Sequence, residues 1–134
     1  MVIRKTYSSD LAKEMLYNAW LSPLMTIDPV TKIECDPVVG GELKLYSKSE
    51  YGDGVMSGKF ALVEPGEKLM YSWHWEGSEE TTQVNVQFLK IEEGTEVQIV
   101  HSGFISNESK EMHDSGWDHY FRSLEDKIRQ TGFQ

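Results

Sequence analysis

Two kinds of hydrophobic spacing divide the first part of the chain. Apolar and polar residues alternate across VIRKTY, residues 2–7, as they do in a half-buried strand. Residues 11–20 then carry apolar side chains at helical spacing, and residues 8–10, Ser-Ser-Asp, offer side chains that could cap such a helix. Pro23 should end it, because proline disfavours helical backbone in the residue before it. The pattern therefore predicts a strand followed by a short helix.

From about residue 33 onward the pattern is that of one strand after another. Turn-forming residues interrupt the apolar runs, as in Gly40-Gly41 and in YGDG at residues 51–54. Short strands joined by tight turns in this way predict an antiparallel meander. The six predicted strands are approximately residues 33–39, 40–50, 56–64, 67–76, 81–92 and 95–104.

A second helix is predicted at about residues 108–130. Apolar residues recur every three to five positions and form a stripe, whereas charged residues fall on the other side. The stripe consists of Met112, Trp117, Phe121, Leu124 and Ile128, and the charged side includes Asp118, Arg122, Glu125 and Arg129. The order strand, helix, six strands, helix predicts an α+β fold with the helices on one face of a single sheet. With 134 residues, the chain should form one domain, residues 1–134.

Aromatic residues are spread over several of these elements. An antiparallel sheet of seven strands twists and curls, so a helix lying in its concave face can enclose a cavity. The aromatic side chains could fill that space as core or line it as a ligand pocket, and the sequence leaves both interpretations open. The candidates are Trp20, Phe60, Tyr71, Trp73, Trp75, Phe88, Trp117 and Phe121.

Gly116 stands inside the predicted second helix, where glycine costs roughly 1 kcal/mol relative to alanine. Without a Cβ atom it lets the helix approach the sheet, or lets a ligand approach the backbone. Close packing of the helix on the sheet is the simpler explanation. Met112, about one turn earlier, has a flexible side chain that suits either a core or the lining of a pocket for varied ligands.

Charge and composition narrow the partners. The formal net charge is −9, which argues against nucleic acid, because binding its phosphates relies on clustered Lys and Arg. No run of eighteen apolar residues is present, so we expect no membrane span. Cys35 is the only cysteine, which excludes an internal disulfide. Together with an N-terminus that lacks a signal-peptide pattern, this predicts a cytoplasmic protein.

The histidines are the main candidates for chemistry. His101 shares strand parity with Val97 and Ile99 and should point inward, as a satisfied core residue, a polar anchor for a ligand or a general base. His113 and His119 are six positions apart, which places them on different helix faces, so we predict no metal site. The sequence contains no phosphate-binding loop, dinucleotide fingerprint or nucleophile elbow. It therefore predicts no cofactor and no catalytic residue.

Four stretches, in order along almost the whole chain, resemble a known family. They are VGGELKLY (39–46), GKFALVEPGEKLMYSW (58–73), TEVQIVHSGF (95–104) and HDSGWDHYFRSL (113–124). The chain resembles the proteins homologous to the C-terminal domain of the activator of the 90-kDa heat-shock protein ATPase, within the START-like, birch-allergen-like superfamily. The resemblance implies a helix-grip fold, in which a curved seven-stranded antiparallel sheet surrounds a long C-terminal helix and leaves a hydrophobic cavity. One departure is Leu62, where members often carry an acidic residue.

Members of that superfamily bind lipids, hormones or polyketides, and some catalyse cyclisation or hydrolysis. We therefore predict non-catalytic binding of a hydrophobic or amphipathic small molecule, with the aromatic candidates, His101, Met112 and Gly116 lining the cavity. One alternative is a co-chaperone-like module that stimulates a heat-shock ATPase, with the chaperone as its partner. The other is a cyclase or hydrolase of the same superfamily that depends on His101.

Overall fold

The structure, a computed structural model, describes residues 1–50 and 52–133. The described residues form seven strands and two helices. In chain order they are β1 (Val2–Ser9), α1 (Lys13–Ala19), β2 (Val30–Cys35), β3 (Glu42–Ser49), β4 (Gly52–Glu64), β5 (Lys68–Trp75), β6 (Thr82–Ile91), β7 (Gly94–Ser102) and α2 (Asn107–Thr131). The first residue of the turn predicted at 51–54 lies outside the described residues.

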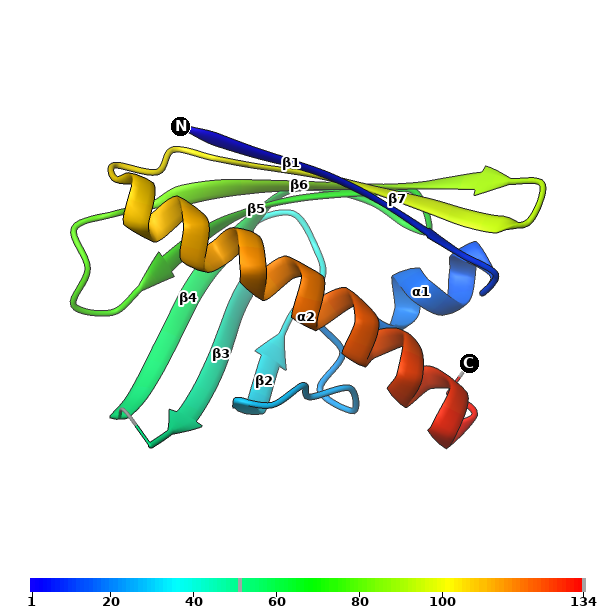
Figure 1. Ribbon diagram of the computed structural model, residues 1–134, viewed down its shortest axis with the longest axis horizontal. Coiled ribbons are helices and arrows are strands. Elements are labelled where there is room, and N and C mark those ends of the chain that lie inside the picture. Colours follow the sequence, from blue (N-terminus) through cyan, green and yellow to red (C-terminus); the bar gives the residue numbers. More distant parts are fainter. Residues whose placement is uncertain (51, 134) are drawn as a thin grey trace.

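The strands form one antiparallel sheet in the order β1-β7-β6-β5-β4-β3-β2. Strands β2 to β7 follow the meander that the turn signals predict, and β1 adds itself beside β7, with Ile3 opposite His101. Figure 1 shows α2 crossing one side of a sheet whose β2–β4 half bends away from the half that holds β1, β7 and β6. The predicted α+β order is therefore the observed one.

Gly58 permits close contact between the paired strands β4 and β5. A Cβ atom on Gly58 would lie 1.9 Å from the backbone oxygen of Ser72, so no larger residue fits without displacing the sheet. The register of β4 against β5 shifts just beyond, between Phe60 and Leu62. Such an irregularity increases the local twist of a strand.

The core lies between the sheet and the two helices. Leu16 and Ala19 of α1 are buried, and the Trp20 ring that follows meets Phe88 of β6 edge-to-face. The second half of α2 buries its apolar residues at the end of the sheet where α1 also lies (Figure 1). The buried residues of this helix are Trp117, Phe121, Leu124 and Ile128.

The predicted cap of the first helix is wrong. β1 continues to Ser9, which pairs with Thr95, and α1 begins only at Lys13 with Ala12 at its N-cap and no side-chain cap. The Ser9 hydroxyl instead accepts a hydrogen bond from the Leu11 amide at 3.1 Å. Long-range strand pairing thus determined the conformation of this segment, where local capping preference suggested a helix start.

The predicted faces of α2 also need two corrections. Met112 was placed in the buried stripe but is 65% exposed, because the first turns of α2 stand over a pocket rather than against the sheet. Asp118 was placed on the solvent side but contacts β1, where its carboxylate lies 3.2 Å from the Lys5 ammonium and accepts a 2.7 Å hydrogen bond from the Tyr7 hydroxyl. The helix crosses the edge strand closely enough for its charged side to meet that strand.

The second predicted strand was displaced along the chain. β2 spans Val30–Cys35 rather than residues 33–39, and residues 36–41 form the connection to β3. The expected Gly40-Gly41 pair ends that connection, with Gly40 in positive-φ backbone (φ 82°) and its amide bonded to the Phe60 carbonyl.

No helix in the described part of the chain is long and apolar enough to cross a membrane.

Candidate functional site

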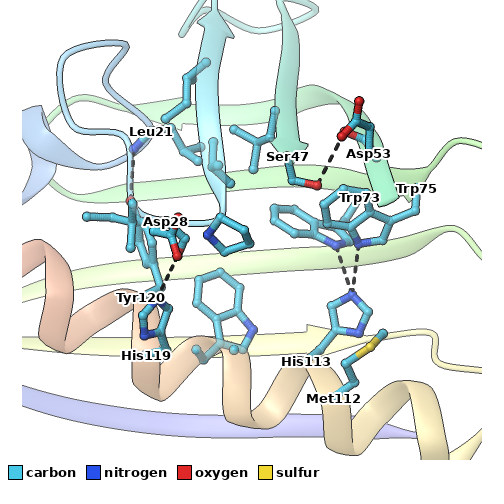
Figure 2. Close-up of a pocket in the computed structure, with 18 of the residues that line it drawn as sticks. Leu21, Asp28, Ser47, Asp53, Trp73, Trp75, Met112, His113, His119 and Tyr120 are labelled. Atoms are coloured by element: carbon cyan, nitrogen blue, oxygen red, sulfur yellow. Dashed lines mark hydrogen bonds between the residues drawn. The ribbon is translucent and has the colours of Figure 1, made fainter. Parts of the chain in front are cut away.

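A pocket of about 530 Å³ lies between the N-terminal half of α2 and strands β2 to β5 (Figure 2). The segment between α1 and β2 completes its wall. Its lining consists of Leu21, Ile27, Asp28, Pro29, Val30, Ile33, Leu45, Ser47, Gly52, Asp53, Gly54, Tyr71, Trp73, Trp75, Met112, His113, Gly116, Trp117, His119 and Tyr120. Most of these side chains are apolar or aromatic, as expected of a small-molecule site.

The structure divides the residues proposed from the sequence into two groups. One group lines the pocket and consists of Tyr71, Trp73, Trp75, Met112, Gly116 and Trp117. The other group is buried in the core outside the pocket lining and consists of Trp20, Phe60, Phe88, His101 and Phe121. The second group packs against other rings: Phe88 contacts Tyr17 and Trp20, and Phe121 stacks on Tyr7 with ring centres 4.5 Å apart.

Gly116 does not serve close packing of the helix on the sheet, which had been the simpler explanation. The residue is exposed, and a Cβ atom built on it would meet nothing within 4 Å. Since Gly116 lines the pocket, its missing side chain leaves open space where α2 passes over the cavity.

His113 joins the two tryptophans of β5 to α2. The indole N–H groups of Trp73 and Trp75 both point at its Nε2 atom, at 3.2 and 3.3 Å (Figure 2). Its Nδ1 atom lies 2.8 Å from the Ser109 carbonyl oxygen. A carbonyl only accepts, so Nδ1 carries the proton and Nε2 is the acceptor for both indoles. This arrangement is that of a neutral imidazole.

The three tryptophans of the pocket all have their indole N–H groups bonded within the protein. Trp73 and Trp75 are nearly perpendicular, at 86° with centres 6.0 Å apart, and Trp117 lies 6.2 Å from Trp73. The N–H groups of Trp73 and Trp75 are occupied by His113, and that of Trp117 donates to His101 Nδ1 at 3.1 Å. A ligand therefore meets aromatic surface without free indole donors.

His101 is a satisfied core residue beneath this wall. Its Nδ1 accepts from Trp117, and its Nε2 lies 2.6 Å from the Thr82 hydroxyl, which itself bonds to the Trp73 carbonyl at 3.3 Å. Burial, with a smaller contribution from nearby His113, lowers the pKa of His101 to about 3. Both nitrogens are engaged and the side chain is fully buried. These contacts position Trp117 and leave His101 no free nitrogen with which to act as a general base.

Two phenols supply hydroxyl groups at the pocket wall. The Tyr71 hydroxyl accepts from the Trp20 indole N–H at 3.3 Å, and the Tyr120 hydroxyl accepts from the Leu21 amide at 3.3 Å. Burial raises the pKa of both phenols, so both remain protonated. Among the described residues neither hydroxyl proton has an acceptor, but Tyr71 is fully buried, so the partly exposed Tyr120 is the one that can donate to an oxygen atom of a ligand.

Two carboxylate residues belong to the lining, Asp28 before β2 and Asp53 on β4, and both are exposed. Asp53 stands opposite Lys48 and alternates with the pocket-facing Gly54, so its carboxylate lies on the other face of the sheet. At the rim of the pocket, His119 Nε2 lies 2.8 Å from the Asp28 backbone oxygen. Within residues 1–50 and 52–133, no three His, Cys, Asp or Glu side chains form a group suited to a metal ion.

Sequence reasoning missed the central role of His113. It was considered only as a metal ligand, and its partners lie 38 and 40 positions away on β5. The one local signal was its position on the helix turn before Trp117, on the side that faces the sheet.

Comparisons with known proteins identify a family from the sequence and a fold from solved structures. The family model described as Activator of Hsp90 ATPase homolog 1-like protein matches residues 10–128. No curated protein matches the sequence at a significant level.

Solved structures extend the comparison over the whole chain. Protein MLL2253 from Mesorhizobium loti is similar with a TM-score of 0.84 and 21% identity, covering 98% of each chain. CalU16 from Micromonospora echinospora has a TM-score of 0.73 and 22% identity, covering 95% of this chain and 74% of that one. The protein Ara h 8.0201 has a TM-score of 0.81 and 11% identity, covering 97% and 98%. At these identities the similarity shows the fold alone, and the helix-grip prediction is confirmed.

Proposed function

The chain belongs to the Activator of Hsp90 ATPase homolog 1-like family, and from this premise we propose that it binds a hydrophobic or amphipathic small molecule between its sheet and α2, without catalysing a reaction. One observation carries the proposal. The pocket is walled by aromatic faces whose polar edges are already bonded within the protein, through His113 and His101. Such a wall favours apolar contact with a ligand and offers little chemistry for turnover.

The size of the pocket supports a ligand of moderate dimensions. About 530 Å³ lies within the range of cavities that hold drug-sized molecules. The Tyr120 hydroxyl, which accepts from the Leu21 amide, provides a donor that would orient a ligand oxygen within an otherwise apolar space. The remaining candidates Trp73, Trp75, Trp117 and Met112 would contribute contact area.

Gly116 offers a direct test of the location. A leucine at this position would add a branched side chain to a residue that lines the pocket, whereas an alanine would add a single methyl group with nothing within 4 Å. Isothermal calorimetry with 2-(naphthalen-2-yl)ethanol should show binding to the natural protein and to Gly116→Ala. Binding to Gly116→Leu should be at least about tenfold weaker, as expected when contact area is lost and a site is obstructed. Equal binding by all three proteins would place the ligand elsewhere.

A second candidate function is contact with a heat-shock chaperone, and the description of the family favours it. Pull-down with the chaperone and an ATPase assay examine this directly. Stimulation of the ATPase at saturating protein would support the role, and unchanged turnover would leave only the small-molecule proposal.

We also infer that residues 1–134 act as one domain in the cytoplasm. The support is the single cysteine of the sequence, Cys35, which is half-buried. Burial raises the pKa of its thiol to about 11, which disfavours the reactive thiolate. Cell fractionation of the tagged protein tests the location, and recovery in an extracytoplasmic fraction would contradict it.

A further inference from the structure

We propose that the pocket selects its ligand by charge: it takes a flat hydrophobic molecule bearing a protonated amine in preference to one bearing a carboxylate. This inference rests on the proposed function, because it names the class of ligand for the same pocket. Three features of the lining lead to it: the sign of the charged side chains, the aromatic faces, and the engagement of the indole donors.

The one charged side chain at the rim of the pocket is negative. Asp28, in the segment before β2, is exposed there beside His119 (Figure 2). Asp53 also belongs to the lining, but its side chain lies on the other face of β4, because Gly54 faces the pocket and Asp53 stands opposite Lys48. In the described part of the chain no lysine or arginine lines the pocket. An amine at the rim would meet the Asp28 carboxylate, whereas a carboxylate there would be repelled by it.

The aromatic wall has the same preference. The face of an indole ring carries negative potential and attracts cations, most strongly when the cation loses part of its water shell. Trp73, Trp75 and Trp117 line the pocket from β5 and α2, with Trp73 and Trp75 nearly perpendicular. Two rings at such an angle can contact one ammonium group from two sides.

The groups that would favour an anion are mostly occupied. All three indole N–H groups bond to histidine nitrogens, two to His113 and one to His101. The Tyr120 hydroxyl can donate to a ligand oxygen, but a neutral hydroxyl does not neutralise a carboxylate. Burying an anion without a compensating positive charge is costly.

Three ligands with one skeleton isolate the effect of charge. 2-(Naphthalen-2-yl)ethylamine, 2-(naphthalen-2-yl)ethanol and naphthalen-2-ylacetate are compared by isothermal calorimetry at pH 8 and 150 mM NaCl. We expect the amine to bind roughly tenfold more tightly than the carboxylate, with the alcohol between them, from one partly screened ion pair and one cation–π contact. An amine that binds no more tightly than the carboxylate would overturn the charge preference.

Matched variants separate the pocket from the overall charge of −9. Asp28→Asn removes one charge at the rim of the pocket. Asp53→Asn removes one exposed charge on the other face of the sheet, and Glu92→Gln removes one exposed charge in the turn between β6 and β7. We expect Asp28→Asn to reduce the preference for the amine over the alcohol at least about threefold and the two control variants to leave it unchanged. Asp28→Ser gives the same comparison if Asp28→Asn folds poorly.

The outcomes distinguish the two proposals. If the alcohol binds and the amine and carboxylate bind equally, the pocket binds ligands without charge selection and only this inference fails. If none of the three ligands binds, the proposed function fails with it. An equal loss of amine preference in Asp28→Asn and in the control variants would attribute the effect to net charge and overturn the role of the Asp28 carboxylate.

Discussion

Gly116→Ala should stabilise the protein, although it places a larger residue in a helix that covers a pocket. Gly116 lies ten residues into the 25-residue helix α2, where alanine is favoured over glycine by roughly 1 kcal/mol. The added Cβ atom would meet nothing within 4 Å, so no clash offsets this gain. The residue is exposed, so burial changes little. We therefore expect an increase in the free energy of unfolding of about 0.5 to 1 kcal/mol.

The assay is urea denaturation followed by circular dichroism, with the midpoint compared at equal slope. The midpoint temperature of thermal unfolding should rise by roughly 2 to 5 °C for a domain of this size. Gly58→Ala is the matched control, because its Cβ would lie 1.9 Å from the Ser72 backbone oxygen and should destabilise strongly. A loss of stability in Gly116→Ala would mean that α2 lies closer to the sheet than described, and the open space over the pocket would then not exist.

Other positions test the core and the aromatic wall. The pKa of His101 is lowered to about 3 in the folded protein, so its contribution to stability is complete above pH 6.5 and falls by on the order of 3 kcal/mol by pH 4. Denaturation across this pH range should show a smaller loss of stability in His101→Gln than in the natural protein, and an identical profile would contradict the lowered pKa. Phe88→Ala should lower the free energy of unfolding by about 3 to 5 kcal/mol and keep a single transition, because a fully buried ring is removed from between Tyr17 and Trp20. A decrease below about 1 kcal/mol would contradict this packing. His113→Ala should lower the free energy of unfolding by about 1 to 2 kcal/mol and speed hydrogen exchange at the indole N–H groups of Trp73 and Trp75, which lose their acceptor. Unchanged exchange would show that those hydrogen bonds do not form in solution.

Period-two spacing correctly placed one wall of the pocket. Tyr71, Trp73 and Trp75 share a face of β5 because alternation is a local property of a strand, and all three line the pocket. The same reasoning could not tell pocket from core at Phe60 and Phe88, which occupy inward positions on their own strands. That distinction depends on where α1 and α2 rest on the sheet, and strand spacing carries no such information.

Errors in the prediction arose where distant segments meet. Ser9 has the composition of a helix cap, yet its pairing with Thr95 keeps it in β1. Asp118 has the spacing of a solvent residue, yet β1 brings Lys5 and Tyr7 to it. These contacts join residues more than eighty positions apart. A single sequence holds no signal for such pairs, whereas the order of elements and the fold class follow from local patterns and turns.

The most direct measurement of the central claim uses the indole N–H signals of the four tryptophans, in a ¹⁵N correlation spectrum assigned by Trp→Phe variants. Titration with 2-(naphthalen-2-yl)ethanol should shift the signals of Trp73, Trp75 and Trp117, whose rings line the pocket, more than that of Trp20, which lies in the core. A spectrum in which all four signals stay in place at saturating ligand, or in which Trp20 alone responds, would contradict a binding site between the sheet and α2.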